Sequence, residues 1–291
     1  MCAMAKAKYL CLNGQFRLAA DPVLLAGNRA FRFGDALVEN IHAWSTEAQL
    51  LEKHYCRLIN SMTLLGMALP ASLTVPSLSR FITQLLNRNK IFGGAGIRLT
   101  VFRETGENML PDDQKVSFII ESEAIEASKY MLNEKGYVID VCQEYRRSGG
   151  VLSGIKTTGY LPNVMTALFC KQHALDDAIM LNESGRITGS TRSNIFLVRA
   201  SSLFTPVLGQ GCIPGIMREV IINLAIDAGL QVNDHSSLTP AVLDDADEVF
   251  FTNAVEGIRW TGAYRQRRFY KNTAQMLIRK LNDKIFGGRE A

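Results

Sequence analysis

The spacing of apolar residues predicts alternating strands and helices in the first part of the chain. Tyr9 to Leu12 is a short apolar run followed by Asn13-Gly14, a dipeptide typical of hairpin turns. Leu50 to Leu65 and Leu78 to Leu86 carry apolar residues at the period of an amphipathic helix. The expected strands are Leu37 to Trp44, Ile97 to Phe102 and Val116 to Ser122. These elements predict a first α/β unit.

Periodicity is lost between about Glu123 and Glu134, where we place a linker, and a second α/β unit follows. Pro214 stands where a helix would begin and Gly229 just past its end, which is the asymmetry expected of a helix over Ile216 to Ala228. The other expected elements are helices over Leu161 to His173 and Thr273 to Lys284, and strands over Val138 to Cys142, Asp177 to Asn182, Asn194 to Val198 (after a Gly189-Ser190-Thr191 turn) and Glu248 to Thr252.

Composition excludes several classes of protein. With 47% hydrophobic and 21% charged residues, the chain has ordinary soluble composition and can bury a large core. The net charge is +4, and the densest basic run (Arg265, Arg267, Arg268) is expected to be a solvated turn, so we predict no nucleic-acid partner. No segment reaches about 18 uninterrupted apolar residues, and Met1 to Leu12 lacks the apolar stretch of a leader, so we expect neither a membrane span nor export.

The six cysteines show no CxxC spacing, and the four histidines do not stand at metal-ligand intervals beside them. We therefore expect free thiols in a reducing cytoplasm and no metal site. Neither an HExxH nor a GxxxxGK[ST] motif occurs, which argues against a metal hydrolase or a nucleotide-binding protein. The cysteines are Cys2, Cys11, Cys56, Cys142, Cys170 and Cys212.

Lys156 is the first candidate for chemistry. It lies in the small-residue stretch SGIKTT, just ahead of an apolar helix that begins near Leu161. A lysine amine in a partly dry pocket can attack a carbonyl, because desolvation lowers its pKa and frees the lone pair. The spacing alone does not distinguish this from an ordinary lysine near a helix start.

Four blocks of sequence add to this picture. Asn28 to Asp35 reads NRAFRFGD, His54 to Leu58 reads HYCRL, and Lys156 to Val164 reads KTTGYLPNV. A closing series between Ile187 and Arg218 reads ITGSTRSNIF, then TP, then PGIMR. These blocks resemble, in order, the DRGxxYGD, HxxRL, lysine and EGxxxNIF…TP…PGxxR motifs of the class IV aminotransferases, a family that includes branched-chain aminotransferases, D-amino acid aminotransferases and aminodeoxychorismate lyase.

The resemblance implies an α/β (α+β) protein with the two-domain PLP fold type IV, similar to D-amino acid aminotransferase. It implies an N-terminal domain over about 1–125, a C-terminal domain over about 134–291 that carries the Schiff-base lysine, and pyridoxal 5′-phosphate (PLP) in the cleft between them. Family members are homodimers, so a homodimer is expected.

Family roles can be carried over residue by residue. Lys156 would form the Schiff base with PLP and then move the proton between the substrate's α-carbon and C4′ of the cofactor. Arg57, in HxxRL, would pair with the cofactor phosphate, unless it is an exposed arginine on an amphipathic helix. The backbone N–H groups of Ile216 and Met217 would form a second phosphate clamp at the start of a helix.

Further residues follow with less specific roles. Asn194 could contact the cofactor or hold the turn ahead of its strand, and Arg98 could bind a substrate carboxylate or be a surface arginine. The resemblance also places Gly189, Ser190, Thr252 and Asn253 at the cofactor, and Phe33 and Ala254 near the substrate.

One position departs from the family pattern. A glutamate five positions before the asparagine of NIF pairs with the pyridine nitrogen in the family, and here that position is Gly189. Loss of the carboxylate weakens the electron sink on which transamination and lyase chemistry depend. Three interpretations stay open: another acid such as Glu183 replaces it, the activity is low or specialised, or turnover is lost.

The resemblance favours transfer of an amino group between an α-amino acid and a 2-oxo acid. Val38-Glu39-Asn40 resembles the FET motif of the aminotransferases, whereas Thr252 to Trp260 looks more like the lyase-type members. The alternatives are therefore an aminodeoxychorismate lyase that releases pyruvate to give 4-aminobenzoate, and a PLP-binding homologue with reduced or lost turnover.

Overall fold

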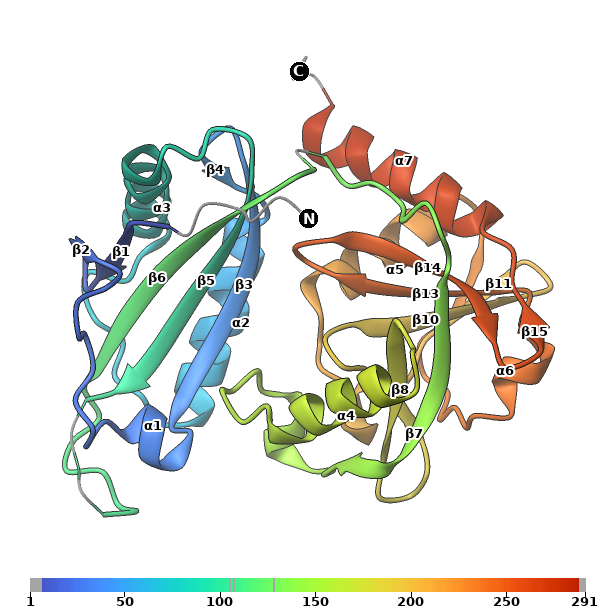
Figure 1. Ribbon diagram of the computed structural model, residues 1–291, viewed down its shortest axis with the longest axis horizontal. Coiled ribbons are helices and arrows are strands. Elements are labelled where there is room, and N and C mark those ends of the chain that lie inside the picture. The colour runs from blue at the N-terminus through green and yellow to red at the C-terminus, as the bar shows by residue number, and fades with distance from the viewer. Residues whose placement is uncertain (1–6, 105, 107, 128, 288–291) are drawn as a thin grey trace. The chain divides into compact units, whose positions relative to one another are not determined.

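The computed structural model describes residues 7–104, 106, 108–127 and 129–287 (Figure 1). Cys2 lies outside the described residues. The chain divides into two compact units. One contains residues 1–129 together with Lys156–Gly159, and the other contains Tyr130–Ile155 and the chain from Tyr160 onward.

The first unit is built on an antiparallel sheet with strand order β2-β1-β6-β5-β3-β4. Helix α2 (Leu51–Leu64) packs on β3, and α3 (Val75–Asn89) packs on β1, β4 and β6. Seven of the nine residues of β3 are buried, including the polar Glu39 and His42. The strands are β1 (Tyr9–Leu12), β2 (Gln15–Leu18), β3 (Ala36–Trp44), β4 (Glu47–Ala48), β5 (Gly94–Arg103) and β6 (Val116–Ile125).

Local signals in the sequence account for two features of this unit. The Asn13-Gly14 hairpin turn is confirmed: both residues have positive φ, 50° and 85°, as the tight turn requires. Helix α3 begins three residues before the expected Leu78, because the Thr74 side chain caps the N–H of Ser77 and Pro76 fits the first turn.

The second unit has a nine-stranded mixed sheet in the described residues, ordered β12-β11-β10-β13-β14-β7-β8-β9, with β15 paired to β14. Helix α4 (Leu161–Gln172) packs on β7 and β8, and α5 (Ile216–Asp227) packs on β13 and on α7 (Asn272–Phe286). The remaining elements are β7 (Tyr137–Arg147), β8 (Asp177–Asn182), β9 (Ile187–Ser190), β10 (Asn194–Arg199), β11 (Ser202–Phe204), β12 (Gln231–Asn233), β13 (Glu248–Asn253), β14 (Gly257–Tyr264), β15 (Arg267–Arg268), α6 (Val242–Asp245) and the 3-10 turns Val151–Gly154 and Leu208–Gln210.

Two local expectations need correction. Gly189 and Ser190, expected in a turn, end strand β9, because pairing with β8 outweighs the low strand propensity of these residues. Strand β6 runs to Ile125, into the segment expected to be a linker.

Lys156–Gly159 packs with the first unit, although the sequence assigned this segment to the second domain. The N–H of Val38 donates to the carbonyl of Lys156 at 2.9 Å, and the N–H of Thr158 donates to that of Ala36 at 3.2 Å. The Thr158 hydroxyl also donates to the carbonyl of Gly34. The lysine segment therefore takes its position from the first residues of β3.

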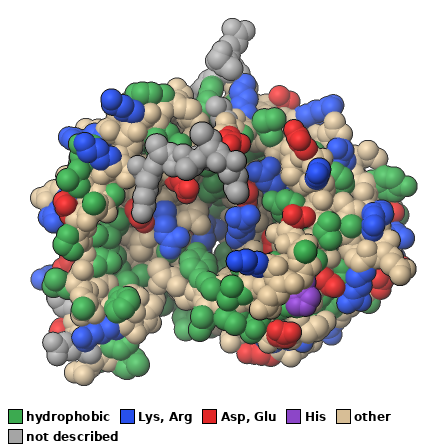
Figure 2. All heavy atoms as spheres, in the orientation of Figure 1, with side chains coloured by type: hydrophobic (Ala, Val, Ile, Leu, Met, Phe, Trp, Pro, Cys, Tyr) green, Lys and Arg blue, Asp and Glu red, His purple; other side chains and the backbone are tan. Residues whose placement is uncertain are grey.

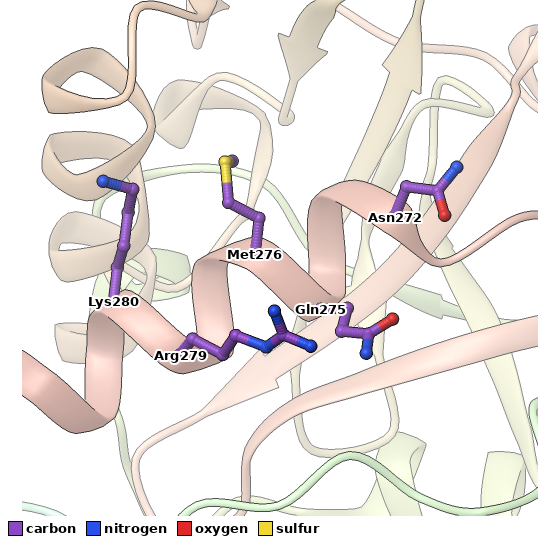
Figure 3. Close-up of a pocket in the computed structure, with 5 residues that line it drawn as sticks. All are labelled: Asn272, Gln275, Met276, Arg279 and Lys280. Atoms are coloured by element: carbon purple, nitrogen blue, oxygen red, sulfur yellow. The ribbon is translucent and has the colours of Figure 1, made fainter.

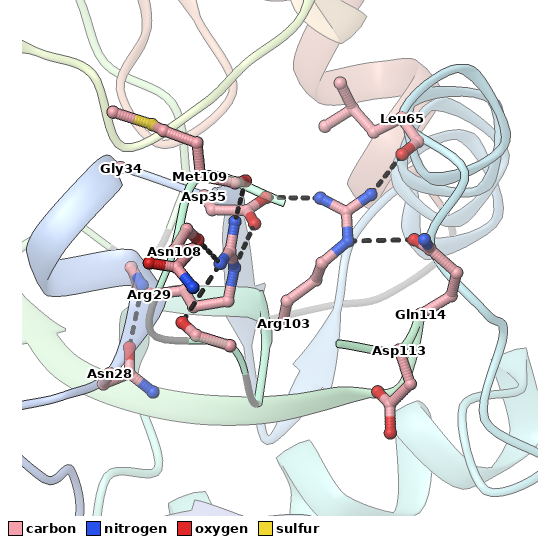
Figure 4. Close-up of polar contacts among 12 residues, drawn as sticks. Asn28, Arg29, Gly34, Asp35, Leu65, Arg103, Asn108, Met109, Asp113 and Gln114 are labelled. Carbon is pink, nitrogen blue, oxygen red and sulfur yellow. Dashed lines mark hydrogen bonds and ion pairs between the residues drawn. The ribbon is translucent and has the colours of Figure 1, made fainter. Parts of the chain in front are cut away.

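Asp35, immediately before β3, joins two arginines (Figure 4). Its Oδ2 is 2.8 Å from Nε of Arg29 in α1 (Arg29–Phe33), and its Oδ1 is 2.6 Å from Nη1 of Arg103. The Arg103 guanidinium also donates to the carbonyl of Leu65 and to Gln114. Arg29 donates further to three carbonyls of the β5–β6 connection, those of Gly106, Asn108 and Met109. Arg29 and Asp35 of the NRAFRFGD block therefore join several segments of this unit.

Replacing Asp35 with asparagine is expected to lower the free energy of unfolding by about 3 kcal/mol, because two largely buried guanidinium groups lose their counter-charge. Denaturant unfolding measures the change. The matched control is Asp113→Asn: the Asp113 side chain is 40% exposed and 3.8 Å from Lys115, so its loss should cost under about 1 kcal/mol. Equal stability of Asp35→Asn and wild type would contradict this account.

Candidate active site

Lys156 has the properties required of a nucleophilic amine. Its side chain is half-buried. Burial lowers its pKa to about 8; the carboxylate of Glu39 opposes this shift, and the charges of Arg57 and Arg98 add to it. A substantial fraction of the amine is therefore unprotonated in mildly alkaline solution and can attack a carbonyl carbon.

Glu39 of β3 lies at the centre of this charged group and is only 2% exposed. It accepts a 2.6 Å hydrogen bond from Nδ1 of His54 and two from Arg57, from Nε at 2.8 Å and from Nη2 at 2.6 Å. Burial alone would raise the pKa of Glu39, but these hydrogen bonds and the two neighbouring groups lower it to about 2. Glu39 is therefore a carboxylate at neutral pH.

Burial lowers the pKa of His54 of α2, which favours the neutral imidazole, and the Glu39 carboxylate opposes this shift. An ionised Glu39 can only accept, so Nδ1 of His54 carries the donated proton. Nε2 of His54 is buried without a hydrogen-bond partner among the described residues.

Arg57 also lies on α2, three residues after His54, so both side chains project from one helix face toward β3. Its side chain is 13% exposed, which excludes a solvent-exposed surface arginine. The two-pronged contact with Glu39 fixes the plane of the guanidinium. Contact between Arg57 and a phosphate stays a prediction.

Two expected substrate residues belong to the same unit. Arg98 of β5 is opposite Asn40 of β3, and its charge lowers the pKa of Lys156. Phe33 ends α1, next to Gly34, whose carbonyl accepts the Thr158 hydroxyl. The structure therefore brings together Lys156, Arg57 and Arg98, with Phe33 beside the lysine segment.

In the second unit, several of the residues expected to bind the cofactor lie around the N-terminus of α5. The N-cap of this helix is Gly215, which has no side chain to cap it, so the first-turn N–H groups of Ile216 and Met217 and the helix dipole can receive an anion. A Cβ at Gly215 would overlap Oδ1 of Asn194, which explains the glycine. Asn194 donates to the carbonyl of Ile213 at 2.8 Å and therefore holds the loop ahead of α5.

Two buried hydroxyls lie on the strands and the turn around Asn194. Thr252 pairs with Asn194 across β10 and β13, and Ser190 is at the other end of the short turn that leads into Asn194. Neither Thr252 Oγ1 nor Ser190 Oγ has a hydrogen-bond partner among the described residues. The unpaired buried hydroxyl of Thr252, opposite Asn194 and so close to the start of α5, suits a phosphate dianion and fits the phosphate end of PLP.

Asn253 and Ala254 form part of the β13–β14 turn. The Asn253 amide donates to Glu256 and to Ser193, and its oxygen accepts from two backbone N–H groups of the turn. The carbonyl of Ala254 accepts from the Tyr130 hydroxyl. These contacts stabilise the turn, and the roles expected for both residues at the ligand stay predictions.

A hollow along α7 is lined by five residues of that helix, none of them an expected site residue (Figure 3): Asn272, Gln275, Met276, Arg279 and Lys280. Figure 2 shows Lys and Arg side chains interspersed with Asp and Glu over the visible face. The Arg265–Arg268 run lies exposed in the β14–β15 hairpin. In the described part of the chain, no group of His, Cys, Asp and Glu could hold a metal, and none of the helices meets the length and hydropathy of a membrane span.

The family model for class IV amino-transferases matches residues 36–260. The chain belongs to the class IV aminotransferase family. A protein of Methanocaldococcus jannaschii, named provisionally as a branched-chain-amino-acid aminotransferase, is 29% identical to it over 248 residues, 85% of this chain and 84% of that protein. The aminodeoxychorismate lyase of Vibrio harveyi is 24% identical over 234 residues, 80% of this chain and 84% of the lyase.

Structural similarity agrees with the family. The branched-chain aminotransferase of Thermoproteus uzoniensis, solved with norvaline, superposes with a TM-score of 0.85 at 25% identity, covering 97% of this chain and 96% of that one. The two-domain PLP fold type IV expected from the sequence is therefore confirmed. The class IV protein is an aminotransferase or a related lyase, and PLP is the cofactor that its family implies.

Proposed function

We propose that this chain transfers an amino group between an α-amino acid and a 2-oxo acid with PLP bound at Lys156. The observation that carries the proposal is the half-buried Lys156 amine, with a pKa lowered to about 8, beside Arg57 and Arg98. Membership of the class IV family supports it. A cytoplasmic location and a homodimer stay predictions.

PLP, when bound, supplies a conjugated ring that accepts electrons from the substrate's α-carbon. Lys156 would hold the cofactor's aldehyde carbon through Nζ, and once released its amine would take up and return the substrate's α-proton. Arg57 and Arg98 carry two positive charges against the one negative charge of Glu39, which favours binding of anionic groups such as substrate carboxylates. In the second unit, Ile216, Met217 and Thr252 are the proposed phosphate ligands.

A lyase is the second candidate, in which the same residues support elimination of pyruvate from aminodeoxychorismate to give 4-aminobenzoate. The resemblance of Thr252 to Trp260 to the lyase-type members favours it, and so does the similarity to the Vibrio harveyi lyase. The similarity to branched-chain aminotransferases favours amino transfer.

The test uses purified protein loaded with PLP. We expect a panel of L- and D-amino acids with a 2-oxo acid acceptor to include a donor that yields equal amounts of its own 2-oxo acid and of the new amino acid. Release of pyruvate from aminodeoxychorismate without an acceptor identifies the lyase instead. Protein that binds PLP but performs neither reaction would contradict both candidates.

A further inference from the structure

Gly189 occupies a backbone position that excludes any side chain. Its φ is +142°, a conformation that L-residues rarely adopt. A Cβ built on it would lie 2.6 Å from the carbonyl oxygen of Ser193, well inside van der Waals contact. That oxygen accepts a 2.8 Å hydrogen bond from the N–H of Ser190, so it cannot move away without opening the turn. Position 189, where the family resemblance expects an acid, therefore carries no acid and has no room for a side chain.

The polar group beside this position is a cation. Arg147, at the end of β7, donates from Nη2 to the carbonyl of Ser190 at 3.1 Å. Burial lowers the pKa of Arg147, and electrostatic interaction with Cys212, Tyr160 and Asp177 opposes this shift. A guanidinium nevertheless stays charged throughout the physiological range. The residue after Gly189 therefore contacts a fixed positive charge.

The nearby carboxylates already accept hydrogen bonds from other groups. Asp177 is a carboxylate that acts on Arg147 electrostatically. Its Oδ1 accepts hydrogen bonds from Ala178 N–H and from the N–H and hydroxyl of Thr191. Glu183 is exposed in the β8–β9 turn and accepts from the N–H of Gly149, so the structure gives no support to its replacing the missing glutamate.

Resting on the proposed function, we propose that this chain binds PLP with no acid at the pyridine nitrogen and keeps that nitrogen unprotonated, because position 189 is closed and Arg147 supplies positive charge beside it. An unprotonated pyridine accepts electrons less readily than a pyridinium, so removal of the substrate's α-proton is slow. The site therefore suits a slow amino-group chemistry.

The experiment is ¹⁵N NMR of the wild-type protein loaded with PLP labelled at the ring nitrogen, between pH 6 and 8. The inference predicts the resonance of an unprotonated pyridine nitrogen at every pH. A protonated nitrogen in protein with PLP attached at Lys156 overturns this inference and leaves the proposed function standing. Failure of PLP to attach to Lys156 overturns both.

Variants at two glycines test the closure of position 189 separately. Gly185 also has positive φ, +73°, but an added Cβ there would meet nothing within 4 Å. We expect Gly189→Ala to lower the midpoint of thermal unfolding by at least about twice as much as Gly185→Ala, because only position 189 adds a steric clash to backbone strain. A Gly189→Glu variant with wild-type stability would show that position 189 is not closed and would overturn the inference.

Discussion

Lys156→Ala is expected to lose covalently attached PLP and to transfer amino groups at least about a thousandfold more slowly than wild type. The substitution removes both the amine that binds the cofactor's aldehyde and the group that moves the proton. Visible absorbance of the protein after dialysis reports attachment, and single-turnover kinetics report transfer. Retention of covalent PLP by Lys156→Ala would contradict the assignment.

Two further variants separate the contributions of Lys156. Lys156→Arg keeps the positive charge but removes a lysine amine able to lose its proton, so it should behave like the alanine variant. Lys171→Ala removes an exposed lysine from α4 and should match wild type. If Lys156→Arg retains most of the activity, charge rather than nucleophilicity is what the site requires.

Glu39→Gln is expected to have two separate effects. Removing the counter-charge of the buried Arg57 should lower the free energy of unfolding by about 3 kcal/mol. The Glu39 carboxylate raises the pKa of Lys156, so its loss should bring that pKa below about 8 and shift the rate profile for PLP attachment toward acid. Denaturant unfolding and the pH dependence of attachment measure the two effects.

The pH dependence of stability follows from the same carboxylate. The folded-state pKa of Glu39, about 2, is below the ordinary value of about 4.3, so its contribution is complete above about pH 4.3 and is lost as the pH falls toward 2. Glu39→Gln should therefore lose less stability than wild type across that window. Glu123→Gln, at an exposed position of β6, is the control and should change neither property. An unchanged or raised pKa of Lys156 in Glu39→Gln would show that Glu39 does not act on the amine.

Local patterns in the sequence predicted most elements of the fold. Helix α5 follows the Pro214 and Gly229 signals closely, ending one residue before the expected Ala228. Strand β14 was missed, because GIRWTGAY mixes glycine and charged residues, and it becomes a strand through pairing with β13 on one side and β7 on the other. The contact of Lys156–Gly159 with β3 was missed for a similar reason: the partners are more than a hundred residues apart.

The candidate site was predicted in part. Motif resemblance singled out Lys156 and Arg57, whereas Arg98 was expected as a carboxylate ligand or a surface arginine; the charges of both arginines act on Lys156. The resemblance gave Glu39 no role in the site and His54 none beyond its motif. A signal was present: Glu39 is an acid inside the otherwise largely apolar run ALVENIHAW, and a buried carboxylate requires hydrogen-bonded, oppositely charged partners. The sequence also showed that no acid stands at Gly189, but only the backbone angle and the Ser193 carbonyl show that none can be accommodated.

Borohydride reduction of the wild-type protein with bound PLP, followed by peptide mass mapping, tests the central claim most directly. The reduction fixes the cofactor to whichever amine holds it. We predict that the peptide containing Lys156 gains the mass of one reduced cofactor. We also predict that the attachment of PLP to Lys156 increases as the pH rises through about 8. An unmodified Lys156 peptide, or equal labelling of several exposed lysines, would contradict the account.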